Sequence, residues 1–169
     1  MPERLFALGK AAEAAGIDPG FLSQRINRGD PVLDEERDIA ATGRGSARMF
    51  SLDTILQIAI AERLRRLGVP FKDGLKAACT YVLVGGNSVK GEREPGQPFT
   101  SGRTLLVHSP AGTGVVNTHR KPGDSTLFGI LCDALNAPSN DFTDGDYAVA
   151  IVDIGGIHRH VSVSLGISA

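Results

Sequence analysis

The beginning of the chain places apolar side chains at helical spacing before a glycine. Between residues 8 and 15 they recur every three or four positions, at Leu8, Ala11, Ala12 and Ala15. This spacing predicts a helix with one buried face. The glycine that follows, Gly16, predicts where the helix ends.

A second short helix is predicted directly after the first. Asp18 suits the N-cap position and Pro19 the first helical position. The helix is expected to end near Gly29. Two short helices joined by a tight turn that contains glycine form a helix-turn-helix. We therefore expect this motif near the N-terminus.

The rest of the first half predicts a hairpin or extended loop and two longer helices. Residues 34–50 contain two glycines between polar flanks, a pattern typical of a hairpin or a loop. The next helix is expected to begin at Ser51, to carry a broad apolar stripe and to end at Gly68. Another amphipathic helix is expected over residues 70–83.

The pattern changes in the second half of the chain. Residues 85–102 are rich in glycine, proline and charge and show no apolar period, so we expect a linker or a long loop. Beyond them, short β-prone segments surround one amphipathic helical segment, and Gly155-Gly156 suits a two-residue hairpin turn. The predicted elements are strands at 103–109 and 114–120, a helix at 124–137, and strands at 146–154 and 157–167.

Several segments of the first half match a known DNA-binding family in order. They are the first helix and its turn at Ala11–Gly16, the second helix at Phe21–Arg28, the Arg-x-Phe-Ser segment at Arg48–Ser51, the Leu-Arg-x-x-Gly helix end at Arg63–Gly68, and the helix at Phe71–Ala78. By these segments the chain resembles the MerR-like winged helix-turn-helix family over about its first half. The resemblance implies a winged fold that binds duplex DNA through the second helix.

The sequence also departs from that family. Gly85-Gly86 and β-prone segments follow the fourth helix where the family has a long dimerising helix, and the Arg-x-Tyr-Glu segment after the second helix is absent. The family's effector response and promoter-twisting mechanism are therefore not carried over to this chain. Related winged modules also occur in phage excisionases, repressors and DNA-packaging subunits.

The fold class we expect is α+β. A mainly helical winged helix-turn-helix domain is expected at residues 1–84, a linker at 85–102 and a small ββαββ domain at 103–169. The C-terminal strands would offer apolar faces and unpaired edges, so this domain is expected to drive self-association. It could instead sense a small-molecule or protein effector.

The candidate DNA-contacting residues lie on the second helix and in the wing. With Leu22 and Ile26 inward, a helical wheel turns the polar side of the second helix outward. Asn and Gln side chains can pair with adenine edges, and Arg can pair with guanine or phosphate. A solvated surface helix is the alternative, and the wing-like segment that follows favours DNA binding over it. The candidates are Gly20, Ser23, Gln24, Arg25, Asn27, Arg28, Arg44 and Arg48.

Composition and charge give few further indications of function. A net charge of −1 does not itself indicate nucleic acid, although a small module can concentrate cations on one face. No window approaches the roughly 20 apolar residues of a membrane span, and the N-terminus lacks a signal-peptide pattern. Cys79 and Cys132 lie in apolar segments, where free buried thiols are expected. We expect a cytoplasmic protein without a membrane partner.

Enzymatic chemistry has less support in the sequence. His158 and His160 lie two apart in a predicted strand and could bind a metal together with His119 or Asp153. No spacing such as His-Glu-x-x-His or Cys-x-x-Cys accompanies them, and the glycine-rich SPAGTG segment lacks the lysine of a phosphate-binding loop. We therefore expect no catalytic residue, metal or cofactor, and keep a His-dependent metal hydrolase as the alternative in the enzyme class.

Together these patterns predict a sequence-specific transcriptional regulator that binds double-stranded DNA as a homodimer or larger homo-oligomer. Affinity for sites read by one short helix usually comes from pairing two modules on repeated half-sites. A phage or mobile-element factor that acts in recombination, repression or packaging is the alternative within the DNA-binding class.

Overall fold

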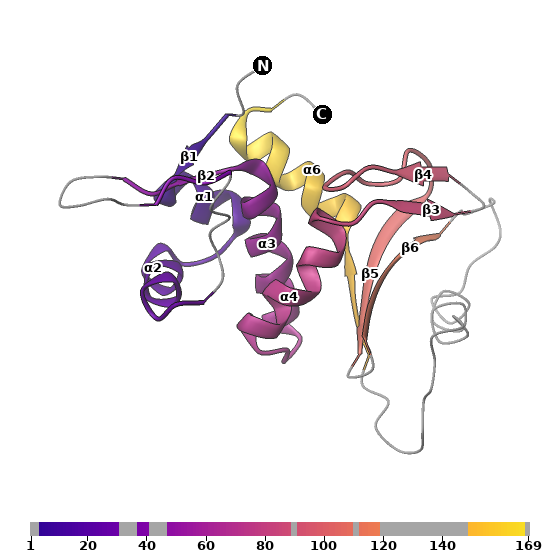
Figure 1. The fold of residues 1–169 in the computed structure, drawn as a ribbon, viewed down its shortest axis with the longest axis horizontal. Coiled ribbons are helices and arrows are strands. Elements are labelled where there is room, and N and C mark those ends of the chain that lie inside the picture. The colour runs from indigo at the N-terminus through magenta and orange to yellow at the C-terminus, as the bar shows by residue number, and fades with distance from the viewer. Residues whose placement is uncertain are drawn as a thin grey trace.

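Helices dominate the first half of the chain, and a three-stranded sheet and a helix follow in the second (Figure 1). The computed structural model describes residues 4–30, 37–40, 47–88, 91–109, 112–118 and 149–167. The mixed α+β class predicted from the sequence is confirmed.

The helices of the first half begin and end where local signals place them. Gly16 takes a left-handed φ of 68° and Gly68 a φ of 95°, conformations that favour glycine because it has no Cβ. The strands β1 and β2 pair antiparallel, with Phe6 opposite Phe50. The elements are β1 Phe6–Ala7, α1 Leu8–Ala15, α2 Pro19–Asn27, β2 Met49–Phe50, α3 Leu52–Arg66 and α4 Phe71–Val82.

The second half forms a small hairpin, then the sheet, then a helix. The sheet has the order β6-β5-β7 with antiparallel neighbours, so β5 is its central strand. The elements are β3 Gly86–Ser88, β4 Gly91–Arg93, β5 Arg103–Ser109, β6 Gly112–Thr118, β7 Ala150–Asp153 and α6 Ile154–Leu165.

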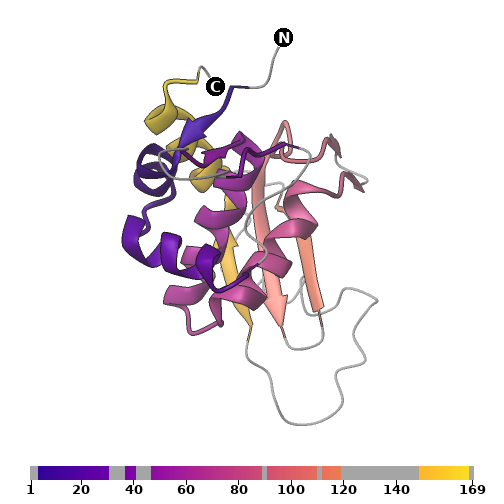
Figure 2. The same ribbon diagram turned by 60° about the vertical axis from the view of Figure 1, so that its left-hand side comes forward.

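The helices α3, α4 and α6 cover one face of the sheet, and α1 and α2 lie on the far side of α3 from it (Figures 1 and 2). Helices α3 and α4 approach closely, because Gly74 presents no side chain to Ala61: a Cβ there would lie 3.1 Å from the Ala61 Cα. This arrangement leaves α2 and the β1–β2 pair at the edge of the molecule.

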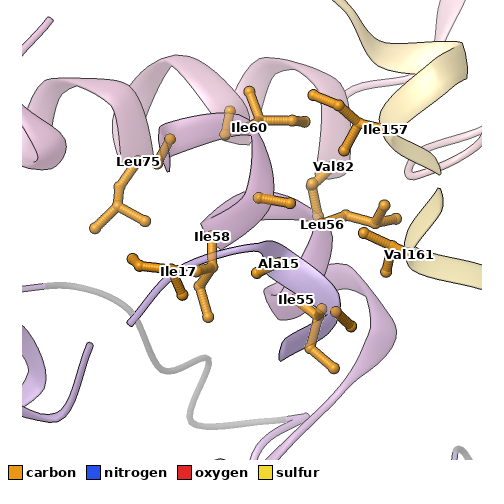
Figure 3. Close-up of a cluster of buried hydrophobic side chains, with 14 of the residues drawn as sticks. Ala15, Ile17, Ile55, Leu56, Ile58, Ile60, Leu75, Val82, Ile157 and Val161 are labelled. Atoms are coloured by element: carbon orange, nitrogen blue, oxygen red, sulfur yellow. The ribbon is translucent and has the colours of Figure 1, made fainter. Parts of the chain in front are cut away.

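One hydrophobic core runs through both halves of the chain (Figure 3). Ile55 and Leu56 of α3 are fully buried in the same cluster as Leu106 of β5 and Val161 of α6. Helix α6 contacts α1 and α3 directly. The residues assigned from the sequence to two separate domains therefore share one packed interior.

The strand predicted at 157–167 is wrong, because residues 157–165 belong to helix α6 and Gly166 is its C-cap. The Asp153 side chain caps the helix by accepting a hydrogen bond from the Gly156 N–H at 3.1 Å. Gly155-Gly156 lies in the first helical turn rather than in a hairpin. The predicted ββαββ order is therefore wrong in its last element.

The segment predicted as a linker contains ordered structure. The strands β3 and β4 pair antiparallel, with Gly86 opposite Arg93. Arg93 and Phe99 are buried, at 5% and 8% exposure. Strands at 103–109 and 150–153 match predicted segments, whereas the helix predicted at 124–137 lies outside the described residues.

Candidate nucleic-acid interface

Helix α2 is fixed at its start by a local capping interaction. The Asp18 carboxylate accepts a hydrogen bond from the Phe21 N–H at 2.7 Å, and Pro19 occupies the first helical position, as predicted. The carboxylate satisfies an N–H group that would otherwise lack a helical partner. The exposed start of α2 therefore keeps a defined geometry.

The inner face of α2 packs against α1 and α4. Leu22 is fully buried and Ile26 is partly buried against the core. The Phe21 ring meets the Phe71 ring of α4 edge to face, at a centroid distance of 5.6 Å. These apolar contacts orient the helix so that its opposite face points away from the molecule.

Arg25, a predicted DNA-contacting residue, turns toward α4 rather than outward. Its guanidinium lies 5.9 Å from the Phe21 ring centroid and 5.8 Å from that of Phe71, within the range of cation–π attraction. It also pairs with the Asp30 carboxylate at 2.5 Å. These contacts attach α2 to α4 and give Arg25 a structural role.

A buried carboxylate at the end of α3 holds the turn between α1 and α2. Glu62 is 2% exposed and accepts hydrogen bonds from Arg65 at 2.7 Å and Arg66 at 2.9 Å. Arg66 also donates to the Gly16 carbonyl at 2.8 Å. Burial raises the pKa of Glu62, but hydrogen bonds and charges from the two arginines outweigh it and lower the pKa.

The outer face of α2 is polar and exposed. Gly20, Gln24, Asn27 and Arg28 are exposed and Ser23 is half-buried, so the predicted outward set does lie outward. Gln24 and Arg28 make no side-chain hydrogen bond or ion pair with any other described residue. Their amide and guanidinium groups remain available to a ligand.

One contact joins this face to a segment distant in the sequence. The Arg48 Nη2 atom donates a hydrogen bond to the Asn27 Oδ1 atom at 2.7 Å. Sequence analysis predicted both residues as DNA contacts, and the structure brings them together. Arg44, the other predicted contact in this segment, lies outside the described residues.

Backbone pairing and side-chain bonds position the segment that carries Arg48. Met49 pairs with Ala7 of β1, and its backbone also exchanges hydrogen bonds with Ile39 at 2.9 and 3.0 Å. The Asp38 carboxylate accepts hydrogen bonds from the Ser51 N–H and the Thr54 hydroxyl, both at 2.7 Å. The chain on either side of residues 40–48 is therefore anchored to β1 and to the start of α3.

His158 and His160 do not share one face, as they would in the predicted strand. His158 and His160 lie on helix α6, where residues two apart point in nearly opposite directions. Among the described residues, no group of three or more His, Cys, Asp or Glu side chains is placed to hold a metal ion. His119 lies outside those residues.

An open pocket of about 640 Å³ lies between the start of α6 and residues 97–104. Its charged lining includes Arg103, Asp153 and Arg159, and Arg103 pairs with Asp153 at 2.5 Å. The Asp153 carboxylate already occupies the N-terminus of α6. The negative charge of this carboxylate at the helix start makes the site less attractive to an anion.

Sequence reasoning missed the residues that support this face. The spacing of Glu62 from Arg65 and Arg66, three and four positions, is typical of helical ion pairs and could have indicated that cluster. No local signal connects Arg25 with Phe71, because the two residues meet only when α2 packs on α4.

No protein-family model matches this chain, and no curated protein is detectably similar to it in sequence. Among the described helices, none combines the length and the apolar character that crossing a membrane requires.

Proposed function

We propose that this protein binds duplex DNA sequence-specifically and regulates transcription, with α1–α2 as a helix-turn-helix and with Arg48, next to β2, in its wing. The observation that carries the proposal is the contact between Asn27, on the exposed face of α2, and Arg48, next to β2. A reading helix and a wing that act on one DNA surface must face the same side of the molecule, and this contact supports such an arrangement.

The chemistry of the α2 face supports this proposal. Gly20 has no side chain, which permits close approach, and Gln24, Asn27 and Arg28 offer the hydrogen-bonding groups that read base edges in the major groove. Apolar and cation–π contacts hold the opposite face. The exposed groups are therefore not needed to stabilise the fold.

We also propose that the protein acts as a homodimer or larger homo-oligomer. A single two-turn helix reads a short site, and joining two modules raises affinity without new contacts. Among the described strands, β6 and β7 are the outer members of the sheet. Their outer edges, in the region 103–169, are the surfaces we propose for self-association.

Selection from a random duplex library tests the DNA-binding proposal. We expect the wild-type chain to enrich a defined motif at moderate salt, and Gln24→Ala/Arg28→Ala to lose that enrichment. Arg63→Ala serves as a matched control, because Arg63 is an exposed arginine of α3. Wild-type protein that enriches no motif over background would refute the proposed function.

A further inference from the structure

We propose that Asn27 and Arg48 form one unit that reads guanine, in which Arg48 holds the Asn27 amide so that it presents hydrogen-bond donors to DNA. The proposal rests on the proposed DNA-binding function and names the base that this part of the surface recognises. It starts from the 2.7 Å hydrogen bond between the Arg48 Nη2 and the Asn27 Oδ1.

This hydrogen bond fixes the orientation of the Asn27 amide. A guanidinium only donates, so it can pair with the amide oxygen and not with the amide nitrogen. The Asn27 Oδ1 is thereby engaged by a charged donor, and the Asn27 NH₂ group faces the other way. Charge-assisted bonds of this kind are about twice as strong as neutral ones, which favours this rotamer in the free protein.

The two side chains come from separately anchored parts of the fold. Asn27 is at the end of α2, which Leu22 and Phe21 hold against the core. Arg48 precedes Met49, which is paired with both Ala7 and Ile39. The unit is therefore assembled before DNA arrives, so that binding costs little side-chain ordering.

The donor pattern of this unit matches one base better than the others. The Asn27 NH₂ and the remaining N–H groups of Arg48 are all donors, and guanine presents two acceptors, N7 and O6, in the major groove. Adenine and cytosine each present an amino donor that needs an acceptor from the protein. With the Asn27 oxygen engaged, the bidentate pairing of Asn with adenine is disfavoured.

Two substitutions separate the roles of the pair. Asn27→Asp keeps an oxygen for Arg48 but removes the donors, so the selected base should change from guanine to cytosine. Arg48→Met releases the amide, so adenine should be accepted beside guanine at the same position. Arg63→Met is the matched control, because it removes an arginine outside the proposed interface, as Arg48→Met does within it, and should leave that position unchanged.

The experiment is library selection with the wild type and the three variants, followed by titration of the selected duplex. Replacing the read guanine with 7-deazaguanine, which lacks the N7 acceptor, should weaken wild-type binding about 5- to 100-fold and Asn27→Asp binding much less. All four proteins should melt within a few degrees of one another, because Asn27 is exposed and Arg48 is only half-buried.

The outcomes distinguish this inference from the proposed function. A motif in which no position responds to both Asn27→Asp and Arg48→Met, or in which 7-deazaguanine has no effect, overturns the guanine-reading unit and leaves DNA binding intact. A library in which no protein enriches any motif overturns both.

Discussion

Replacing Arg93 with methionine is expected to lower the free energy of unfolding by about 3–6 kcal/mol. Arg93 is 5% exposed and donates hydrogen bonds to the Tyr81 carbonyl at 2.8 Å and to the Val84 carbonyl. Its guanidinium also lies 4.9 Å from the centroid of the Tyr81 ring. These contacts fasten the β3–β4 hairpin to the end of α4.

The expected loss of stability follows from the hydrogen bonds that methionine cannot make. Methionine roughly fills the volume of the arginine side chain but cannot donate a hydrogen bond. Carbonyl groups at the end of α4 therefore lose a charged partner at a site that is largely shielded from water. Hydrogen bonds to charged groups contribute about 1.5–3 kcal/mol each, and the two shortest bonds of Arg93, to the Tyr81 and Val84 carbonyls, together account for about 3–6 kcal/mol. For a chain of 169 residues the expected loss corresponds to a fall in melting temperature of about 10 °C.

Urea unfolding followed by far-UV circular dichroism at pH 7 measures this effect. Arg63→Met is the matched control, because Arg63 is exposed on α3 and its replacement should change stability by no more than about 0.5 kcal/mol. If Arg93→Met costs as little as the control, residues 85–102 behave as the flexible linker that their composition predicts, and the packing described for Arg93 does not hold in solution.

Three further changes test the supports of α2. Asp18→Ala should cost about 0.5–2 kcal/mol by thermal melting, since it removes the N-cap. Arg25→Met should cost about 1–2 kcal/mol and leave the selected DNA motif unchanged, since Arg25 packs on Phe21 and Phe71; a changed motif would return Arg25 to the interface. The lowered pKa of Glu62 contributes stability that is present above its unfolded value of about 4.5 and lost as pH falls through the folded value. The free energy of unfolding of Glu62→Gln should therefore fall less steeply than that of the wild type as the pH is lowered. An unchanged pH profile would contradict the pairing of Glu62 with Arg65 and Arg66.

Local signals made the helical first half predictable from the sequence. Gly16 ends α1, Asp18 caps α2 and Ser51 caps α3, where its hydroxyl accepts from the Thr54 N–H at 3.3 Å. Each signal acts within one turn of the residue that carries it. These signals therefore set where each helix begins and ends, while packing of the buried face stabilises it.

The error at α6 came from competing signals that only tertiary burial decides. The segment carries β-branched Val161 and Val163 and a glycine pair that suits a hairpin. The apolar residues at Ile157, Val161 and Leu165 also recur every four positions, and this helical face is the one buried, whereas Val163 is 69% exposed. Burial against α1 and α3 favours the helix.

The candidate site was predictable residue by residue but not as an assembly. The outward positions of Gln24, Asn27 and Arg28 follow from helical periodicity. The contact of Asn27 with Arg48 spans 21 positions, and it depends on how β1 and β2 pair. Periodicity cannot supply that information, because it describes one element at a time.

Backbone amide NMR of the uniformly labelled 17.8 kDa chain, titrated with a duplex enriched from the random library, shows which residues bind DNA. We expect the largest shift changes on α2 and on residues 47–50, with Asn27 and Arg48 among them, and only small changes on β5 and α6. Shift changes centred on β5–β7 or α6, with α2 unperturbed at saturating DNA, would contradict the assignment of the exposed α2 face as the DNA-binding surface.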